Sequence, residues 1–214
     1  DLDLYAKSYD LQPLLATFDV PTTDVRIPSG LTIDGNVLVD GQRYMTSLTA
    51  YEGKGTAKVS AFFDAKQMAY DAQADVQDVD LSHFLPNLQL STFNSQLSIS
   101  GKGTDFLQRN TWMDADVDIA HLGYDKHNLD DIKLQAHLKN GHAMIDLMTC
   151  NALVDGTLNM DVSISKEGKQ DRILSTLSTQ MSHIDLYALG VTPDPLTIGL
   201  AGDFEVNSNL NDSH

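Results

Sequence analysis

The sequence predicts an all-β fold, a repetitive antiparallel meander that forms one elongated, curved sheet with short helical turns and a hydrophobic inner face. Three observations lead to this prediction. Apolar and polar residues alternate along many short runs, as in strands that bury one face. Glycine-containing dipeptides of the kind found in tight turns recur along the chain. Long helical periodicity is absent, so no pattern predicts a helical layer.

Runs of alternating apolar residues occur at 59–63, 68–76, 97–99, 113–119, 132–138, 143–147, 158–164 and 196–206. Side chains point alternately to the two faces of a strand, so each run predicts one apolar face and one polar face. Alternation alone fits both a closed sandwich core and an incompletely covered apolar face that forms a groove for acyl chains. The candidate residues of the groove are Val59, Ala61, Phe63, Ala74, Val76, Leu97, Ile99, Ala115, Val117, Ile132, Leu134, Leu138, Ile145, Leu158, Met160, Val162, Ile198 and Leu200.

Four dipeptides are typical of hairpin turns, because Gly, Asn and Asp tolerate the positive φ of a tight turn. Two of them stand beside clearly alternating runs, which predicts hairpins over 135–145 and 153–164. The run 145–150, by contrast, is predicted to be a strand. The four dipeptides are Asp34-Gly35, Asp40-Gly41, Asn140-Gly141 and Asp155-Gly156.

A short motif recurs four times, starting at positions 9, 79, 117 and 184: apolar, Asp, apolar, two variable residues, apolar, then Leu or Gly. The spacings are near multiples of about 35 residues, which indicates an internal repeat. We expect each copy to end a strand and begin one helical turn, N-capped by Asp10, Asp80, Asp118 or Asp185. The chain 1–214 is then one continuous repetitive segment with halves of roughly 1–105 and 106–214.

The formal net charge of −16 argues against two classes of partner. Binding to nucleic acid depends on Lys and Arg that neutralise phosphates, so no nucleic-acid partner is expected. Docking on an anionic membrane surface is disfavoured for the same reason. The sequence holds no apolar run of the length of a transmembrane helix and no recognisable signal peptide. We therefore expect an excised segment of a larger secreted or periplasmic protein.

No group of residues predicts catalysis, a metal site or a cofactor, so we expect the chain not to be an enzyme. His137 and His142 flank a turn, and the residues around them favour surface histidines over a metal site. The runs 53–56 and 101–104 both read Gly-Lys-Gly-Thr. They lack the full spacing of a phosphate-binding loop, which favours a turn or bulge between strands.

The carboxylates of Asp114, Asp116 and Asp118 alternate along one predicted strand. A calcium loop would need a glycine and a distal Glu that this segment lacks, so the pattern favours one solvent-facing row. Cys150 is the single cysteine and therefore cannot form an internal disulfide. It follows an apolar run, and we predict that it is buried and inert.

Four segments together resemble the C-terminal region of the TamB family, within the AsmA-like group, in its Bacteroidetes form. They are Leu-Gln-Ala-His-Leu-Lys-Asn-Gly at 134–141, Asp-Gly-Thr-Leu-Asn-Met at 155–160, Ile-Asp-Leu-Tyr-Ala-Leu-Gly at 184–190, and Ile-Ser-Gly-Lys-Gly-Thr-Asp at 99–105. The resemblance covers roughly 70–210.

The resemblance implies a periplasmic portion of an inner-membrane-anchored protein of a Gram-negative bacterium, with a β-taco-like sheet folded around a hydrophobic groove. Such proteins of the translocation and assembly module are implicated in phospholipid movement to the outer membrane. With an outer-membrane barrel partner of the TamA or BamA type they are implicated in protein assembly. The anchor helix and barrel-binding tail of the family are not recognisable in this segment.

Three functions follow as expectations. The first is a passive groove whose apolar residues hold phospholipid acyl chains. The second is a structural or interaction module with a closed core, whose open edge adds a strand from an outer-membrane protein. The third, carbohydrate binding, is disfavoured because a single Trp, Trp112, leaves few stacking surfaces.

Overall fold

The computed structural model describes residues 2–7, 28–85, 90–104, 110–124, 127–167 and 170–210. These residues form twelve strands and one short 3₁₀ helix, η1. The elements are β1 (Leu2–Lys7), β2 (Thr32–Asp40), β3 (Arg43–Glu52), β4 (Gly55–Asp64), β5 (Ala69–Asp80), η1 (Leu81–His83), β6 (Leu90–Lys102), β7 (Trp112–Tyr124), β8 (His127–Lys139), β9 (His142–Cys150), β10 (Val154–Glu167), β11 (Gln170–Asp185) and β12 (Thr197–Leu210).

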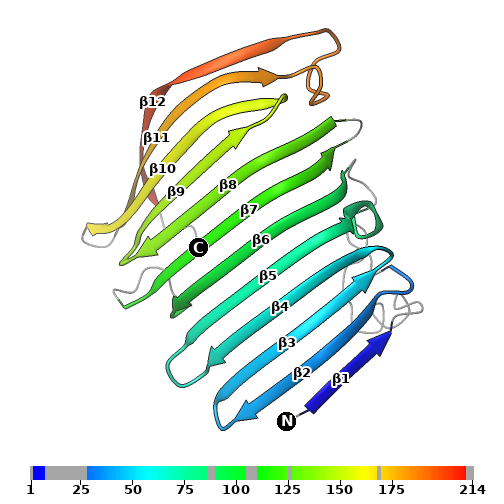
Figure 1. Cartoon of the computed structure of the whole chain (residues 1–214). Helices are drawn as coiled ribbons and strands as arrows, with labels where there is room; N and C mark the ends of the chain where they lie inside the picture. The colour runs from blue at the N-terminus through cyan, green and yellow to red at the C-terminus, as the bar shows by residue number, and fades with distance from the viewer. Residues whose placement is uncertain are drawn as a thin grey trace.

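All twelve strands belong to one sheet, in which strand order follows chain order from β1 to β12 (Figure 1). Every neighbouring pair is antiparallel. The sheet is not closed, because β1 does not pair with β12. The prediction of an all-β antiparallel meander is therefore confirmed.

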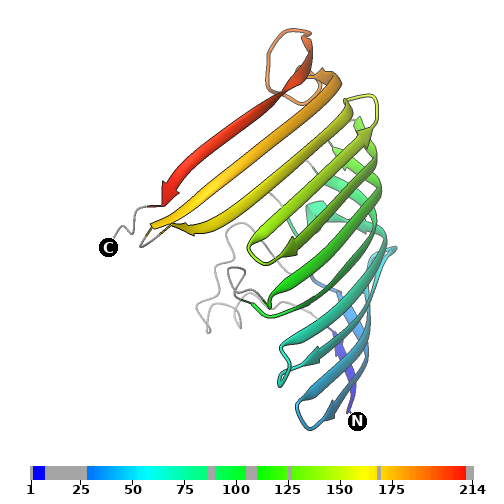
Figure 2. The ribbon, with the colours of Figure 1, turned by 90° about the vertical axis from the view of Figure 1, so that its left-hand side faces the viewer.

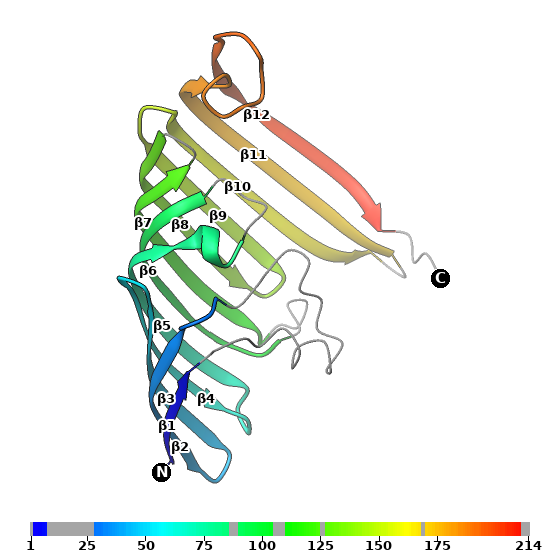
Figure 3. The ribbon, with the colours of Figure 1, turned by 90° about the vertical axis from the view of Figure 1, so that its right-hand side faces the viewer.

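The sheet is curved along its strand order, as the two side views show (Figures 2 and 3). Five register shifts interrupt the pairing, and all five lie toward the end of the sheet where η1 lies. Such bulges bend a strand and increase its local twist. The shifts fall between Val76 and Val79, Leu90 and Phe93, Asn94 and Ser95, Asp155 and Gly156, and Met181 and Ile184.

The apolar layer of this sheet is thin, because many of its side chains are small or carry a hydroxyl group. The buried hydrophobic residues among those described are Val79, Leu153 and Met181. Most other apolar side chains are half-buried against their cross-strand neighbours. Cross-strand pairs on one face are the unit of stabilisation in a sheet, and here they replace a two-layer core over the described residues.

Two of the predicted turns form. Asn140 and Gly141 have φ values of 56° and 77°, and they join β8 to β9 as a tight hairpin. Gly41, with φ of 60°, starts the turn from β2 to β3. The run 53–56 likewise supplies the turn from β3 to β4, so its structural interpretation is confirmed. The run 101–104 covers the end of β6, and these described residues contain no turn or register shift.

The other two dipeptides do not form turns. Gly156 lies inside β10, so the predicted hairpin over 153–164 is wrong. Gly35 lies inside β2. Both glycines permit a close backbone approach instead. A Cβ on Gly35 would lie 2.0 Å from the carbonyl oxygen of Ser47, and one on Gly156 would lie 2.3 Å from that of Gln180.

Two copies of the repeated motif form the predicted helical turn. The carboxylate of Asp80 accepts a 2.9 Å hydrogen bond from the backbone N–H of Ser82 and so N-caps η1. The carboxylate of Asp185 accepts a 2.9 Å hydrogen bond from the backbone N–H of Ala188. Both turns follow a strand that carries a bulge shortly before its end.

The prediction of a turn at Asp118 is wrong. Asp118 lies inside β7, where it faces Lys133 of β8 across a 3.5 Å ion pair, and the backbone continues as a strand to Tyr124. A single Asp between apolar residues occurs both as a helix N-cap and as a polar position on a strand, so the motif alone does not distinguish the two. The remaining copy, at Asp10, lies outside the described residues.

Candidate functional site

The eighteen groove candidates all lie on one face of the sheet. Directly paired residues of an antiparallel sheet share a face, so the register of the strands shows which residues lie on the same side. A row of eight such residues, here called the central apolar row, crosses β3 to β10. It consists of Leu48, Val59, Ala74, Leu97, Val117, Leu134, Leu147 and Leu158.

The length of the central apolar row follows from the strand spacing. Seven steps of about 4.8 Å between neighbouring strands give about 34 Å. The next row on the same face includes Ala61, Ile99, Ala115, Ile145 and Met160. The structure therefore brings the predicted candidates together into one continuous apolar surface, the apolar face.

The groove candidates leave out several members of this face that lie in the predicted alternating runs. Ala72, Ala136 and Leu147 each stand two residues from a predicted candidate in their own strand, so the same alternation was the available signal. The strands β3 and β11 contributed no candidates, because hydroxyl residues such as Thr46 and Thr179 interrupt their apolar alternation.

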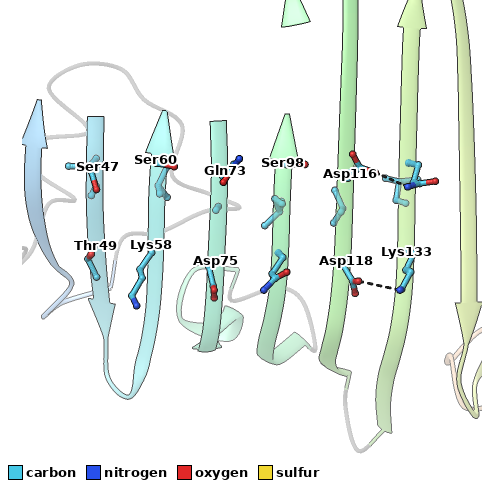
Figure 4. Close-up of a pocket in the computed structure, with 18 residues that line it drawn as sticks. Ser47, Thr49, Lys58, Ser60, Gln73, Asp75, Ser98, Asp116, Asp118 and Lys133 are labelled. Carbon is cyan, nitrogen blue, oxygen red and sulfur yellow. Dashed lines mark hydrogen bonds and ion pairs between the residues drawn. The ribbon is translucent and has the colours of Figure 1, made fainter. Parts of the chain in front are cut away.

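The opposite face, here called the polar face, carries a depression of about 640 Å³. Two rows of polar residues from β3 to β8 line it, together with the residues of the central apolar row that lie between them (Figure 4). One row contains Ser47, Ser60, Gln73, Ser98, Asp116 and Gln135. The other contains Thr49, Lys58, Asp75, Gln96, Asp118 and Lys133.

The polar face is crossed by interactions between β7 and β8. The carboxylate of Asp116 accepts a 2.8 Å hydrogen bond from Gln135, beside the ion pair of Asp118 with Lys133. The side chains of Asp114 and Asp118 are 50% and 51% exposed, which confirms the predicted solvent-facing row. Exposed pairs of this kind stabilise a fold only weakly.

Four histidines each lie against a carboxylate. His137 contacts Asp114 at 2.8 Å, and this hydrogen bond raises the pKa of His137. His142 contacts Asp161 at 2.7 Å instead of meeting His137 across their hairpin. The other two contacts, His83 with Glu52 and His121 with Asp130, measure 2.6 Å. Among the described residues no group of three metal-ligating side chains comes together.

Cys150 is exposed, so the prediction that it is buried is wrong. It ends β9 in the same alternation as Met144, Asp146 and Met148, which belong to the polar face. The apolar run before Cys150 does not determine how the strand pairs with its neighbours. A shift of one residue in that pairing moves a side chain to the other face of a sheet.

No helix in the described ranges is long and apolar enough to cross a membrane. No protein-family model, curated protein or solved structure matches this chain.

Proposed function

We propose that the apolar face holds phospholipid acyl chains, and that the chain is a periplasmic segment of a TamB-like protein that passes phospholipid between the inner and outer membranes. The observation that carries the proposal is the central apolar row, which continues through eight strands without a polar side chain. No second layer of described strands or helices covers it. Large apolar patches on a protein surface mark sites of association.

The dimensions of the row support acyl chains as the occupant. The hydrocarbon core of a bilayer is about 30 Å thick, so the tails of one leaflet span about 15 Å. The central apolar row, at about 34 Å, is long enough for two tails end to end. A lipid tail could therefore move along the row and stay in contact with apolar side chains throughout.

The mechanism is passive. Each square ångström of tail removed from water contributes about 25 cal/mol, and this gain is the same at every point of a uniform apolar row. Head groups stay in solvent beside the sheet. No described residue group resembles a nucleotide site, and the direction of transport is set outside this segment.

The first experiment is native mass spectrometry of the whole chain purified from a Gram-negative bacterium, with analysis of extracted lipid. We expect phospholipid bound at a defined stoichiometry. A lipid-free protein that also takes up no lipid from added vesicles of phosphatidylethanolamine and phosphatidylglycerol contradicts the proposal.

A charge pair tests the site. Leu134 and Leu158 both pair with Leu147, so Leu134→Asp with Leu158→Asp places two carboxylates in one row. We expect lipid loading to be lost. Thr49→Asp with Thr157→Asp is the matched control, because it adds the same charge on the polar face.

Circular dichroism checks that both double variants keep the sheet. If the apolar-face variant does not fold, Leu147→Gln serves as a milder change in the same row. Unchanged loading in a folded apolar-face variant excludes the groove.

The open sheet favours a second candidate function, strand addition by unfolded outer-membrane proteins. Neither β1 nor β12 has a described partner on its outer side, and unpaired edges add strands from other chains. The measurement that tests this is amide hydrogen exchange, with protection of β12 expected when an extended peptide binds.

A further inference from the structure

The outer edge of β12 has the features of an edge strand that can pair with a further strand. β12 ends the strand order and lies at the margin of the sheet (Figure 2). In an antiparallel strand, the backbone groups of alternate residues point to opposite sides. The groups of β12 that point away from β11 therefore have no described strand to pair with.

The apolar side chains of β12 are more exposed than those of the strand beside it. Leu200, Phe204 and Val206 are 45%, 48% and 61% exposed. Met181, the residue of β11 that pairs with Leu200, is 8% exposed. One more strand with apolar residues at alternate positions would give these three side chains a cross-strand neighbour on their open side.

The polar side of the same edge is acidic. A depression of about 560 Å³ lies over β9 to β12, and neither Lys nor Arg is among the described residues around it. Four carboxylates border it, from Asp146, Asp161, Asp203 and Glu205. Asp161 contacts His142, whereas Asp203 and Glu205 belong to the edge strand itself.

We propose that the β12 edge binds an extended peptide segment in which apolar residues alternate with Lys or Arg. The proposal rests on the strand-addition function and adds the chemistry of the partner. The apolar residues of such a segment extend the apolar face beside Leu200 and Phe204. Its basic residues point to the other side, next to Asp203 and Glu205, and opposite charges across paired strands are favourable.

Charge also decides against a second copy of this chain as the occupant. Antiparallel pairing of two β12 edges around Phe204 would set Asp203 of each copy beside Glu205 of the other. Like charges directly opposite each other destabilise strand pairing. Charged residues on an edge strand are a common protection against self-association.

The test uses the whole chain and two labelled peptides, one of alternating Val and Lys and one of alternating Val and Glu. Fluorescence anisotropy measures their binding, and hydrogen exchange locates it. We expect the basic peptide to bind and to protect the amides of β12. For Asp203→Lys with Glu205→Lys, we expect binding of the basic peptide to weaken about tenfold and the acidic peptide to gain.

Asp34→Lys with Asp71→Lys is the matched control, because it reverses two exposed carboxylates on β2 and β5, strands that are paired on both sides. We expect it to leave binding of the basic peptide nearly unchanged. Equal weakening in both double variants would mean attraction to the net charge alone and would overturn the proposal.

Two further results separate this inference from the function on which it rests. If both peptides protect β12 equally and the substitutions have no effect, strand addition stands and the preference for a basic partner is wrong. If neither peptide protects β12, strand addition at this edge is wrong as well. Neither result affects lipid binding on the apolar face.

Discussion

His137 of β8 and Asp114 of β7 face each other across the sheet, with Nδ1 and Oδ1 2.8 Å apart. The hydrogen bond to Asp114 is the main cause of the raised pKa of His137, and the charges of Asp114, Asp116 and Asp146 act in the same direction. Burial lowers the pKa, but by less. The pair therefore links the charge of one histidine to the pairing of two strands.

We predict that Asp114→Asn lowers the pKa of His137 toward its ordinary value, as measured by NMR titration. A raised pKa in the fold means that the pair stabilises fully below the unfolded value of about 6.5 and loses this contribution as pH rises through the folded value. The stability difference between wild type and variant should thus be larger at about pH 5.5 than at about pH 8.5. Asp161→Asn, which removes the partner of His142, is the control and should leave the titration of His137 in place.

Substitutions of Gly156 and Gly41 test how much the close backbone contact matters. Gly156 belongs to the Asp-Gly dipeptide that lies within a strand, and Gly41 to the one that forms a turn. A Cβ on Gly156 would lie 2.3 Å from the carbonyl oxygen of Gln180, whereas one on Gly41 would meet no atom within 4 Å. We expect Gly156→Ala to cost about 3 kcal/mol of unfolding free energy, because paired strands must separate in addition to the strain of its φ of 148°. Gly41→Ala carries only the cost of a left-handed conformation, about 1 kcal/mol. Urea unfolding measures both, and equal losses would contradict the explanation.

The same glycines show how far the sequence predicts the fold. Period-2 alternation predicts the strands and the meander, because it depends on the local geometry of each strand. It also places the eighteen groove candidates on one face. The dipeptides Asn140-Gly141 and Asp155-Gly156 are nearly alike in sequence, yet one makes a turn and the other permits a close approach between strands. That difference depends on the neighbouring strand, which no local pattern contains.

The polar face was harder to predict for the same reason. The row of Asp114, Asp116 and Asp118 follows from alternation, but their partners on β8 follow from the register. The exposed position of Cys150 and the acidic side of the β12 edge also depend on the register and on strand order. Sequence therefore predicts which residues share a strand face better than which residues meet across strands.

Asp80 and η1 provide a prediction about the repeated turn. The carboxylate of Asp80 accepts hydrogen bonds from the hydroxyl and the backbone N–H of Ser82, and the hydroxyl is the larger cause of its lowered pKa. We expect Asp80→Ala to cost about 1 kcal/mol of unfolding free energy, as for other N-caps. A lowered pKa means that this stabilisation is present above the unfolded value of about 3.9 and is lost as pH falls through the folded value.

Urea unfolding at neutral and at acidic pH measures the effect of Asp80→Ala. Asp71→Ala is the control, because it removes an exposed carboxylate from the same strand. A cost for Asp80→Ala that persists when the carboxylate is protonated would show that the side chain acts through packing and not as a cap.

Cys150 provides the last prediction, since its side chain is exposed on the polar face at the end of β9. Thiol reagents react with accessible thiolates, and a buried cysteine is protected until the protein unfolds. We expect one thiol to react with a disulfide reagent in the folded protein at a rate within about tenfold of that in urea. Absorbance during the reaction follows this rate, and Cys150→Ser, which retains the shape of the side chain, should give no signal. Labelling that requires urea would place Cys150 inside a covered part of the protein and would contradict its position opposite Asp155 on the polar face.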